Sequence, residues 1–234
     1  MWDRPTLKHR AKLVLSKSYW HSFLVSLVTI IVPSVVYFIV IFFFMFLAVP
    51  LSRYSYGHYS TVTFVYLLVY MAATIGFFFL TYVLFAGKNL YYINCSRGDI
   101  QFNYAFLPLT SGKFLKVGGT MLLMSIRIFL WSLLFFIPGI IKAYQYCMVP
   151  YIVAENPDIS ISEAIAISTA MTQGEKFNIF ILNMSFMGWY IAASFLPFIG
   201  TLFLLPYIEA TFVELYEALK YKMNVLYTSS PPMR

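Results

Sequence analysis

The sequence has little charge and very little cysteine or histidine. Only 11% of its 234 residues are Asp, Glu, Lys or Arg, and it contains two cysteines and three histidines. Cys95 and Cys147 have no Cys-x-x-Cys spacing, so we interpret them as two unpaired thiols and not as a metal or redox pair. The histidines His9, His21 and His58 are scattered along the chain, and we expect no metal site from them.

Catalytic motifs are also missing. The chain has no Walker A loop, no Gly-x-Ser-x-Gly turn, no His-Glu-x-x-His helix and no dinucleotide-binding fingerprint. Its nine acidic residues form no paired cluster suited to lipid phosphotransfer. Basic flanks account for the net charge of +7, so nucleic acid is not an expected partner. The sequence therefore predicts a protein that is not an enzyme, with no catalytic, cofactor-binding or metal-binding residues.

What the chain has instead is long apolar runs. Hydrophobic residues make up 61% of it, and the run 23–51 carries no charge. A helix needs roughly 20 apolar residues to cross the hydrocarbon of a bilayer, and this run exceeds that length. The runs are continuous and not alternating, which favours helices over barrel strands. We therefore expect an all-α, polytopic membrane helical bundle.

Six transmembrane helices are expected in this bundle, at about 23–51, 62–86, 117–137, 140–154, 177–195 and 198–216. Placing both termini in the cytoplasm leaves thirteen of the sixteen Lys and Arg residues inside, including Lys88 in a polar loop from Gly87 to Lys116. Arg53 and Lys142 lie outside, and Arg127 lies within a span. This asymmetry follows the positive-inside rule. A rival count of five treats 114–127 as an interfacial helix followed by one kinked span from Ile128.

The domain organisation follows from these spans. A basic amphipathic segment, 1–22, precedes a single transmembrane domain, 23–219, and a cytoplasmic tail, 220–234, ends the chain. Ser160 lies three residues before Glu163, the spacing of a capping box, which predicts a short amphipathic helix over 161–173 on the inner membrane surface. Prolines are expected to kink or turn the helices at five positions: Pro33, Pro138, Pro150, Pro197 and Pro206.

Two groups of charged residues are the candidate sites. The basic N-terminal segment is expected to contact anionic lipids of the inner leaflet, or simply to fix orientation, through Arg4, Lys8, Arg10, Lys12 and Lys17. Inside the membrane a charge is costly and usually has a partner or faces water. By the rise of an α-helix, Arg127 in the third span lies roughly 15 Å from the inner end and Glu209 in the sixth about 10 Å from it. An arginine side chain can bridge that difference, so we expect the two residues to pair, as a structural clamp or as part of a polar path.

The chain also resembles a known family. The block Leu130–Ser168, the pattern Arg4…Leu7-Lys8…Ala11-Lys12 with Tyr19-Trp20, and the stretches 186–189 and 206–217 are similar to bacterial membrane proteins of domain-of-unknown-function family 975. The resemblance implies a multi-span helical protein of a bacterial cytoplasmic membrane. It supplies no activity and no functional residues.

Three functions agree with these observations. The first is a non-enzymatic component that assists transport, export or envelope upkeep, as a small carrier or accessory subunit. The second is an immunity protein that protects against an antimicrobial peptide, and the third is a lipid-modifying enzyme. The expected partners are membrane lipids, together with either another membrane protein or further copies of the chain.

Overall fold

The structure, a computed structural model, describes residues 2–54, 59–195 and 199–229. All regular structure in these ranges is helical, which confirms the all-α fold. The elements are α1 (Arg4–Tyr54), α2 (Tyr59–Ser96), a 3-10 turn η1 (Phe102–Phe106), α3 (Leu107–Thr110), α4 (Phe114–Leu134), α5 (Phe136–Gln145), α6 (Val149–Glu155), α7 (Ile161–Met171), α8 (Lys176–Met184), α9 (Met187–Ser194) and α10 (Ile199–Ser229).

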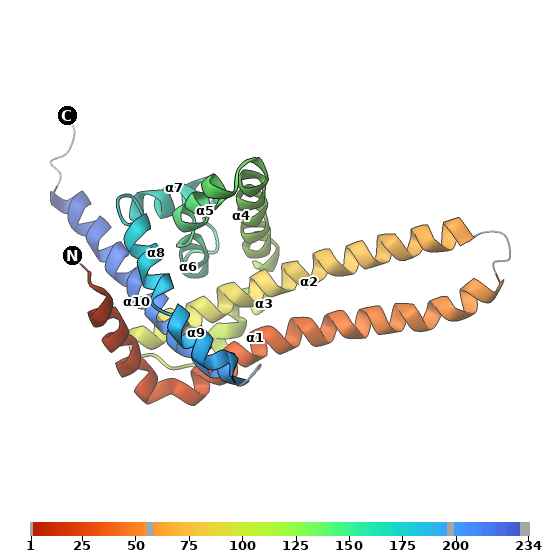
Figure 1. The fold of residues 1–234 in the computed structure, drawn as a ribbon, viewed down its shortest axis with the longest axis horizontal. Coiled ribbons are helices and arrows are strands. Elements are labelled where there is room, and N and C mark those ends of the chain that lie inside the picture. Colours follow the sequence, from red (N-terminus) through yellow and green to blue (C-terminus); the bar gives the residue numbers. More distant parts are fainter. Residues whose placement is uncertain (1, 55–58, 196–198, 230–234) are drawn as a thin grey trace.

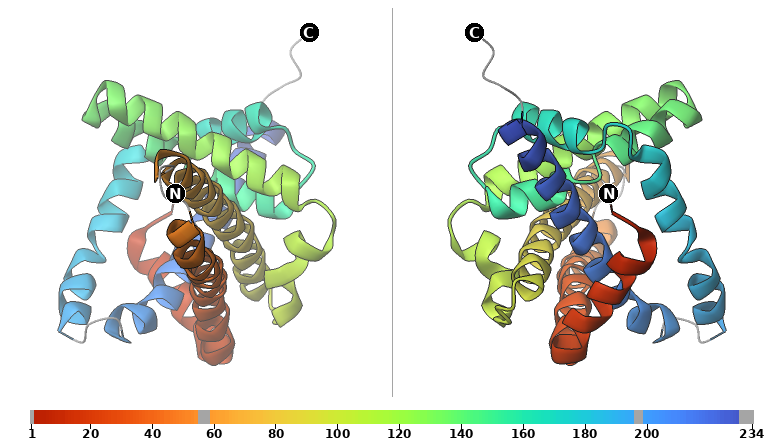
Figure 2. Two further views of the ribbon diagram at one scale, coloured as in Figure 1. Left: turned by 90° about the vertical axis from the view of Figure 1, so that its right-hand side faces the viewer. Right: turned by 90° about the vertical axis from the view of Figure 1, so that its left-hand side faces the viewer.

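Helices α1 and α2 form a long antiparallel hairpin that projects from the rest of the molecule (Figure 1). We call its projecting part, residues 30–46 and 64–82, the arm. The arm exposes large apolar side chains, and Phe42 and Phe46 are 73% and 70% exposed. The other helices gather around the opposite end of the hairpin, where the start of α1 and the end of α10 also lie (Figure 1). Seen along the hairpin, α4 crosses it and α8 and α9 lie to one side (Figure 2).

The inner half of α2 is the centre of the packed body. From Val83 to Cys95 this helix is buried on nearly every side, by α1, α4, α6, α10 and η1. Gly87 allows the closest of these approaches, because a Cβ atom built there would lie 2.0 Å from the carbonyl oxygen of Ala105 in η1. The predicted polar loop from Gly87 is therefore wrong in its first part, since α2 continues as a helix to Ser96.

Four helical stretches within the described residues are long and apolar enough to cross a membrane: Arg4–Phe46, Phe64–Ser96, Phe114–Leu134 and Lys176–Ser194. The predicted count of six is not confirmed. The predicted fourth span, 140–154, is divided between α5 and α6 by non-helical residues from Tyr146 to Met148. The predicted sixth span lies within α10, which continues to Ser229 through the start of the predicted tail.

The short helix predicted over 161–173 from local signals is present in the structure as α7, which ends at Met171. The Ser160 side chain caps it by accepting a hydrogen bond of 3.2 Å from the backbone N–H of Glu163. Soon after its end, Gly174 takes a φ of +76°, a conformation that favours glycine. Of the prolines expected to bend helices, Pro33 and Pro206 lie inside α1 and α10, while Pro138 and Pro150 lie in the first turns of α5 and α6. Pro197 lies outside the described residues.

Candidate functional site

A buried ion pair lies where α2 packs against α10. Lys88 Nζ donates to Glu209 Oε1 at 2.5 Å, and the two side chains are only 9% and 14% exposed. The pair corrects the sequence prediction, which gave Glu209 the partner Arg127. Arg127 is an exposed residue of α4, and the partner that Glu209 has in the structure is Lys88, which the sequence analysis placed in a loop.

Burial of this pair is tolerated because each charge has a close partner. Removing two charges from water is expensive, and their attraction offsets that cost only when the geometry is good. Lys88 Nζ gains a second favourable contact, since it lies 4.3 Å from the centroid of the Phe85 ring one turn earlier on α2. The lysine is thus held between a carboxylate and an aromatic face.

Three tyrosines lie close enough to Glu209 to be affected by its charge. Its charge acts on the phenols of Tyr92 from α2, Tyr151 from α6 and Tyr190 from α9. The Tyr92 hydroxyl donates to the backbone carbonyl of Ser22 at 3.1 Å and lies 2.8 Å from Ser26 Oγ. Five helices, α1, α2, α6, α9 and α10, therefore contribute polar groups to this one region. We call Lys88, Asn89, Tyr92, Tyr151 and Glu209 the polar centre.

Asn89 is the unusual member of the polar centre. Its side chain is fully buried, and neither its amide nitrogen nor its amide oxygen has a hydrogen-bond partner within the described part of the chain. A buried polar group without a partner costs about 1–3 kcal/mol, which is why most are satisfied. An amide that can both donate and accept is therefore left without a partner at the residue that follows Lys88 on α2.

A row of serines on α1 faces the polar centre. Ser18, Ser22 and Ser26 recur every fourth residue and are all buried, which places them on one face of the helix. Ser22 Oγ lies 3.5 Å from the hydroxyl of Tyr91 on α2. Small residues of this kind let membrane helices approach closely. Sequence reasoning missed this row, although its four-residue spacing is readable.

Beyond the end of α2, an ion cluster joins three elements. Arg97 contacts Glu155 at the end of α6, and its Nη2 also donates to Glu217 Oε1 of α10 at 2.6 Å. The other oxygen of Glu155 accepts from Lys220 Nζ and from the Tyr216 hydroxyl, both at 2.5 Å. Burial alone would raise the pKa of Glu155, but its three donors outweigh it and hold the pKa below the ordinary value of 4.5.

Two further ion pairs fix neighbouring segments. Lys222 Nζ of α10 donates to Glu175 Oε1, just before α8, at 2.5 Å. Burial acts to raise the pKa of Glu175, but hydrogen bonds led by that from Lys222 lower it overall. Lys113 contacts Asp158, so the segment before α4 is tied to the turn before α7. These contacts tie the predicted cytoplasmic segments into one body.

The five basic residues predicted to contact lipid occupy different surroundings. Lys8 Nζ lies 4.5 Å from the centroid of the Phe186 ring, and Lys12 Nζ lies 5.8 Å from that of Tyr207. Arg4, Arg10 and Lys17 are exposed. Lys142, predicted outside the membrane, packs over Trp131 with Nζ 5.1 Å from the ring centroid.

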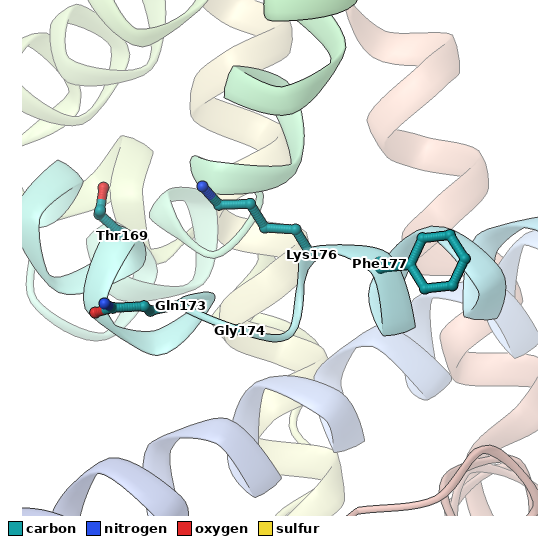
Figure 3. Close-up of a pocket in the computed structure, with 5 residues that line it drawn as sticks. All are labelled: Thr169, Gln173, Gly174, Lys176 and Phe177. Carbon is teal, nitrogen blue, oxygen red and sulfur yellow. The ribbon is translucent and has the colours of Figure 1, made fainter.

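A hollow of about 430 Å³ lies between the end of α7 and the start of α8. Figure 3 shows the amine of Lys176 extending toward the side of Thr169, while the ring of Phe177 lies on α8 beyond it. The hollow is open to its surroundings and lies apart from the polar centre. Within the described residues, no group of three His, Cys, Asp or Glu side chains could hold a metal ion.

No curated protein and no solved structure matches the chain. A family model described as "Protein of unknown function (DUF975)" matches residues 133–223. The matched region contains Glu155 and Glu209, whereas Lys88 and Asn89 precede it. It also contains α7 with its cap and most of α10. This match confirms the resemblance to the family of proteins of unknown function called DUF975 over residues 133–223.

Proposed function

We propose that this chain is a non-enzymatic component of a bacterial cytoplasmic membrane that assists transport, export or envelope upkeep, as a small carrier or as an accessory subunit. The polar centre is the point at which it handles a polar or charged group. The observation that carries this proposal is the buried Lys88–Glu209 pair, and the next residue of α2, Asn89, adds a buried amide without a hydrogen-bond partner within the described residues. Ionisable residues within membrane segments are expensive, and they commonly mark substrate or ion pathways.

The arrangement around the pair supports a functional role over a purely structural one. An ion pair that only holds two helices together needs two charges and neighbouring polar groups that all have hydrogen-bond partners. The polar centre instead combines an ion pair with tyrosine hydroxyls and an amide that has no partner. An unsatisfied polar group reduces stability, so its presence in an otherwise apolar body favours a use in binding.

Six crossings with both termini in the cytoplasm are part of this proposal. Helix α10 provides the sixth crossing, and α5 with α6 provides the fourth. Fusing a phosphatase or a fluorescent protein after Arg234 tests the topology. We expect the C-terminal fluorescent fusion to fluoresce and the C-terminal phosphatase fusion to be inactive. An N-terminal fluorescent fusion is also expected to fluoresce. A phosphatase-active C-terminal fusion would instead support five crossings.

The function is tested by purifying the protein in native-lipid discs and identifying what co-purifies by mass spectrometry. The wild type is compared with the double variant Lys88→Met/Glu209→Leu, which replaces the pair by apolar side chains of similar size, and with Arg127→Gln as a control distant from the pair. We expect a stoichiometric membrane protein or an enriched small molecule with the wild type and the control, and its loss with the double variant. A partner protein identifies an accessory subunit, and a small molecule identifies a carrier.

Two results would overturn the proposal. One is a wild-type preparation that contains the chain and bulk lipid alone. The other is a double variant that retains the same co-purifying species as the wild type, because the polar centre would then have no part in binding it.

A further inference from the structure

The outward face of α1 differs in character from the face that packs into the body. Leu7, Ala11, Leu15, Ser18 and Ser22 are buried and follow the repeat of an α-helix. On the opposite side, a second set at the same helical spacing is exposed. We call this set the α1 stripe: Arg10, Leu13, Lys17, Trp20 and Leu24.

The structure divides the N-terminal cations into two groups. Lys8 and Lys12 lie against aromatic rings of the body, and Lys8 Nζ also lies 3.5 Å from the Ser185 carbonyl oxygen. Arg10 and Lys17 are exposed on the α1 stripe and form no ion pair within the described residues. Arg10 interacts with Asp3 and Glu214 at longer range.

The apolar members of the α1 stripe are also exposed. Trp20 is 66% exposed, Leu13 is 55% exposed and Leu24 is 48% exposed. Trp20 stands between Lys17 and the long apolar part of α1, and its ring packs edge-on against Tyr19 and Phe23. From Lys17 onward, a cation followed by tryptophan and then leucine matches the order of chemistry met on passing from headgroups into hydrocarbon, while Leu13 lies between the two cations.

We propose that the α1 stripe binds anionic phospholipids at the membrane–water boundary. Arg10 and Lys17 donate hydrogen bonds to the phosphate oxygens of the headgroup, Trp20 lies at the level of the lipid carbonyls, and Leu24 contacts the acyl chains. The occupant is a lipid and not free phosphate, because the apolar members of the stripe adjoin the two cations. The proposal rests on the membrane location in the proposed function but not on the polar centre.

The test uses full-length protein in detergent, titrated with phosphatidylglycerol or with phosphatidylcholine and followed by native mass spectrometry. The variant Arg10→Gln/Lys17→Gln is compared with Lys8→Gln/Lys12→Gln, which removes the same charge from the same helix at the two cations that lie over aromatic rings. Two headgroup contacts correspond to about 10- to 30-fold in affinity. We expect the first variant to bind phosphatidylglycerol that much more weakly, with phosphatidylcholine binding unchanged and the second variant close to wild type.

Conservative exchange and phosphate competition complete the test. The variant Arg10→Lys/Lys17→Arg keeps both charges and is expected to bind like the wild type, while inorganic phosphate at millimolar concentration is expected not to compete. Equal losses from the two glutamine variants would overturn the proposal, since total charge alone would then determine binding. Unchanged phosphatidylglycerol binding in Arg10→Gln/Lys17→Gln would also overturn it. That result would not affect the proposal that the polar centre binds a polar group.

Discussion

Lys88 and Glu209 are 121 residues apart in the sequence, yet Lys88 Nζ and Glu209 Oε1 meet at 2.5 Å in the interior of the protein. The contact joins α2 to α10, two of the longest helices. Because both side chains are largely buried, each charge depends on the other for its stability.

Removing one member of this pair is expected to destabilise the protein strongly. Lys88→Met leaves the Glu209 carboxylate buried without its partner, at a cost of about 3–5 kcal/mol. Lys88→Met/Glu209→Leu removes both charges and is expected to be close to neutral. Denaturant unfolding in a fixed detergent measures the difference. A double variant as unstable as the single one would contradict it, and exchanging the charges of Arg127 and Glu209 is expected to give no rescue.

Asn89→Leu is expected to make the protein more stable. The substitution removes a buried amide without partners and replaces it by an apolar side chain of similar size, which relieves about 1–3 kcal/mol. If the polar centre binds a polar group, the same variant loses the co-purifying species while gaining stability, a common relation at functional sites. Thermal unfolding and mass spectrometry on one preparation report both quantities. A destabilised Asn89→Leu protein would show that the amide is satisfied in the native state.

Two glycines of α2 provide a matched pair of substitutions. Gly87→Ala places a methyl group 2.0 Å from a backbone oxygen of η1, so the turn must move and the protein is expected to lose more than about 1 kcal/mol. Gly76→Ala has open space around its new methyl group, and it is expected to stabilise the helix by about 0.5–1 kcal/mol. Melting temperatures that move in opposite directions confirm the close packing of η1 on α2. A shift of the same sign in both variants contradicts it.

The ion cluster around Glu155 predicts a loss of stability in acid. The pKa of Glu155 in the folded protein lies below the ordinary value of 4.5, so its carboxylate is stabilised by folding. Its contribution is fully present above pH 4.5 and disappears as the pH falls through the folded-state pKa. Thermal unfolding between pH 7 and pH 3 should show wild type more stable than Glu155→Gln at the upper end, with the difference shrinking below about pH 4.5. A pH-independent difference would show that Glu155 does not titrate with folding.

Local signals in the sequence predicted the parts of the fold that depend on local physics. The uncharged runs predicted helices long enough to cross a membrane, and the Ser160–Glu163 spacing predicted the cap of α7. Both depend on interactions within one segment. The all-α fold and the resemblance to a known family could also be predicted from the sequence alone.

The partner of Glu209 depends on tertiary packing, which the sequence pattern did not show. Lys88 follows Gly87 and precedes Asn89, a composition typical of a loop, and this hid the continuation of α2 to Ser96. The helical spacing of Leu84, Lys88 and Cys95, all buried, was available as a signal. This spacing indicates a buried helix face only if Lys88 is assumed to be buried. That assumption requires knowing that α10 places Glu209 beside Lys88.

The unbroken length of α2 has a mechanical consequence. The helix passes without interruption from the exposed arm into the body, and the distance from Phe64 to Lys88 along it is roughly 36 Å at the rise of an α-helix. A tilt of the arm is therefore transmitted along a stiff rod to the turn that carries Lys88. Tilting is one way in which a long apolar helix adapts to a bilayer thinner than its apolar length. A change in the thickness of the bilayer around the arm would therefore change the position of Lys88 relative to Glu209.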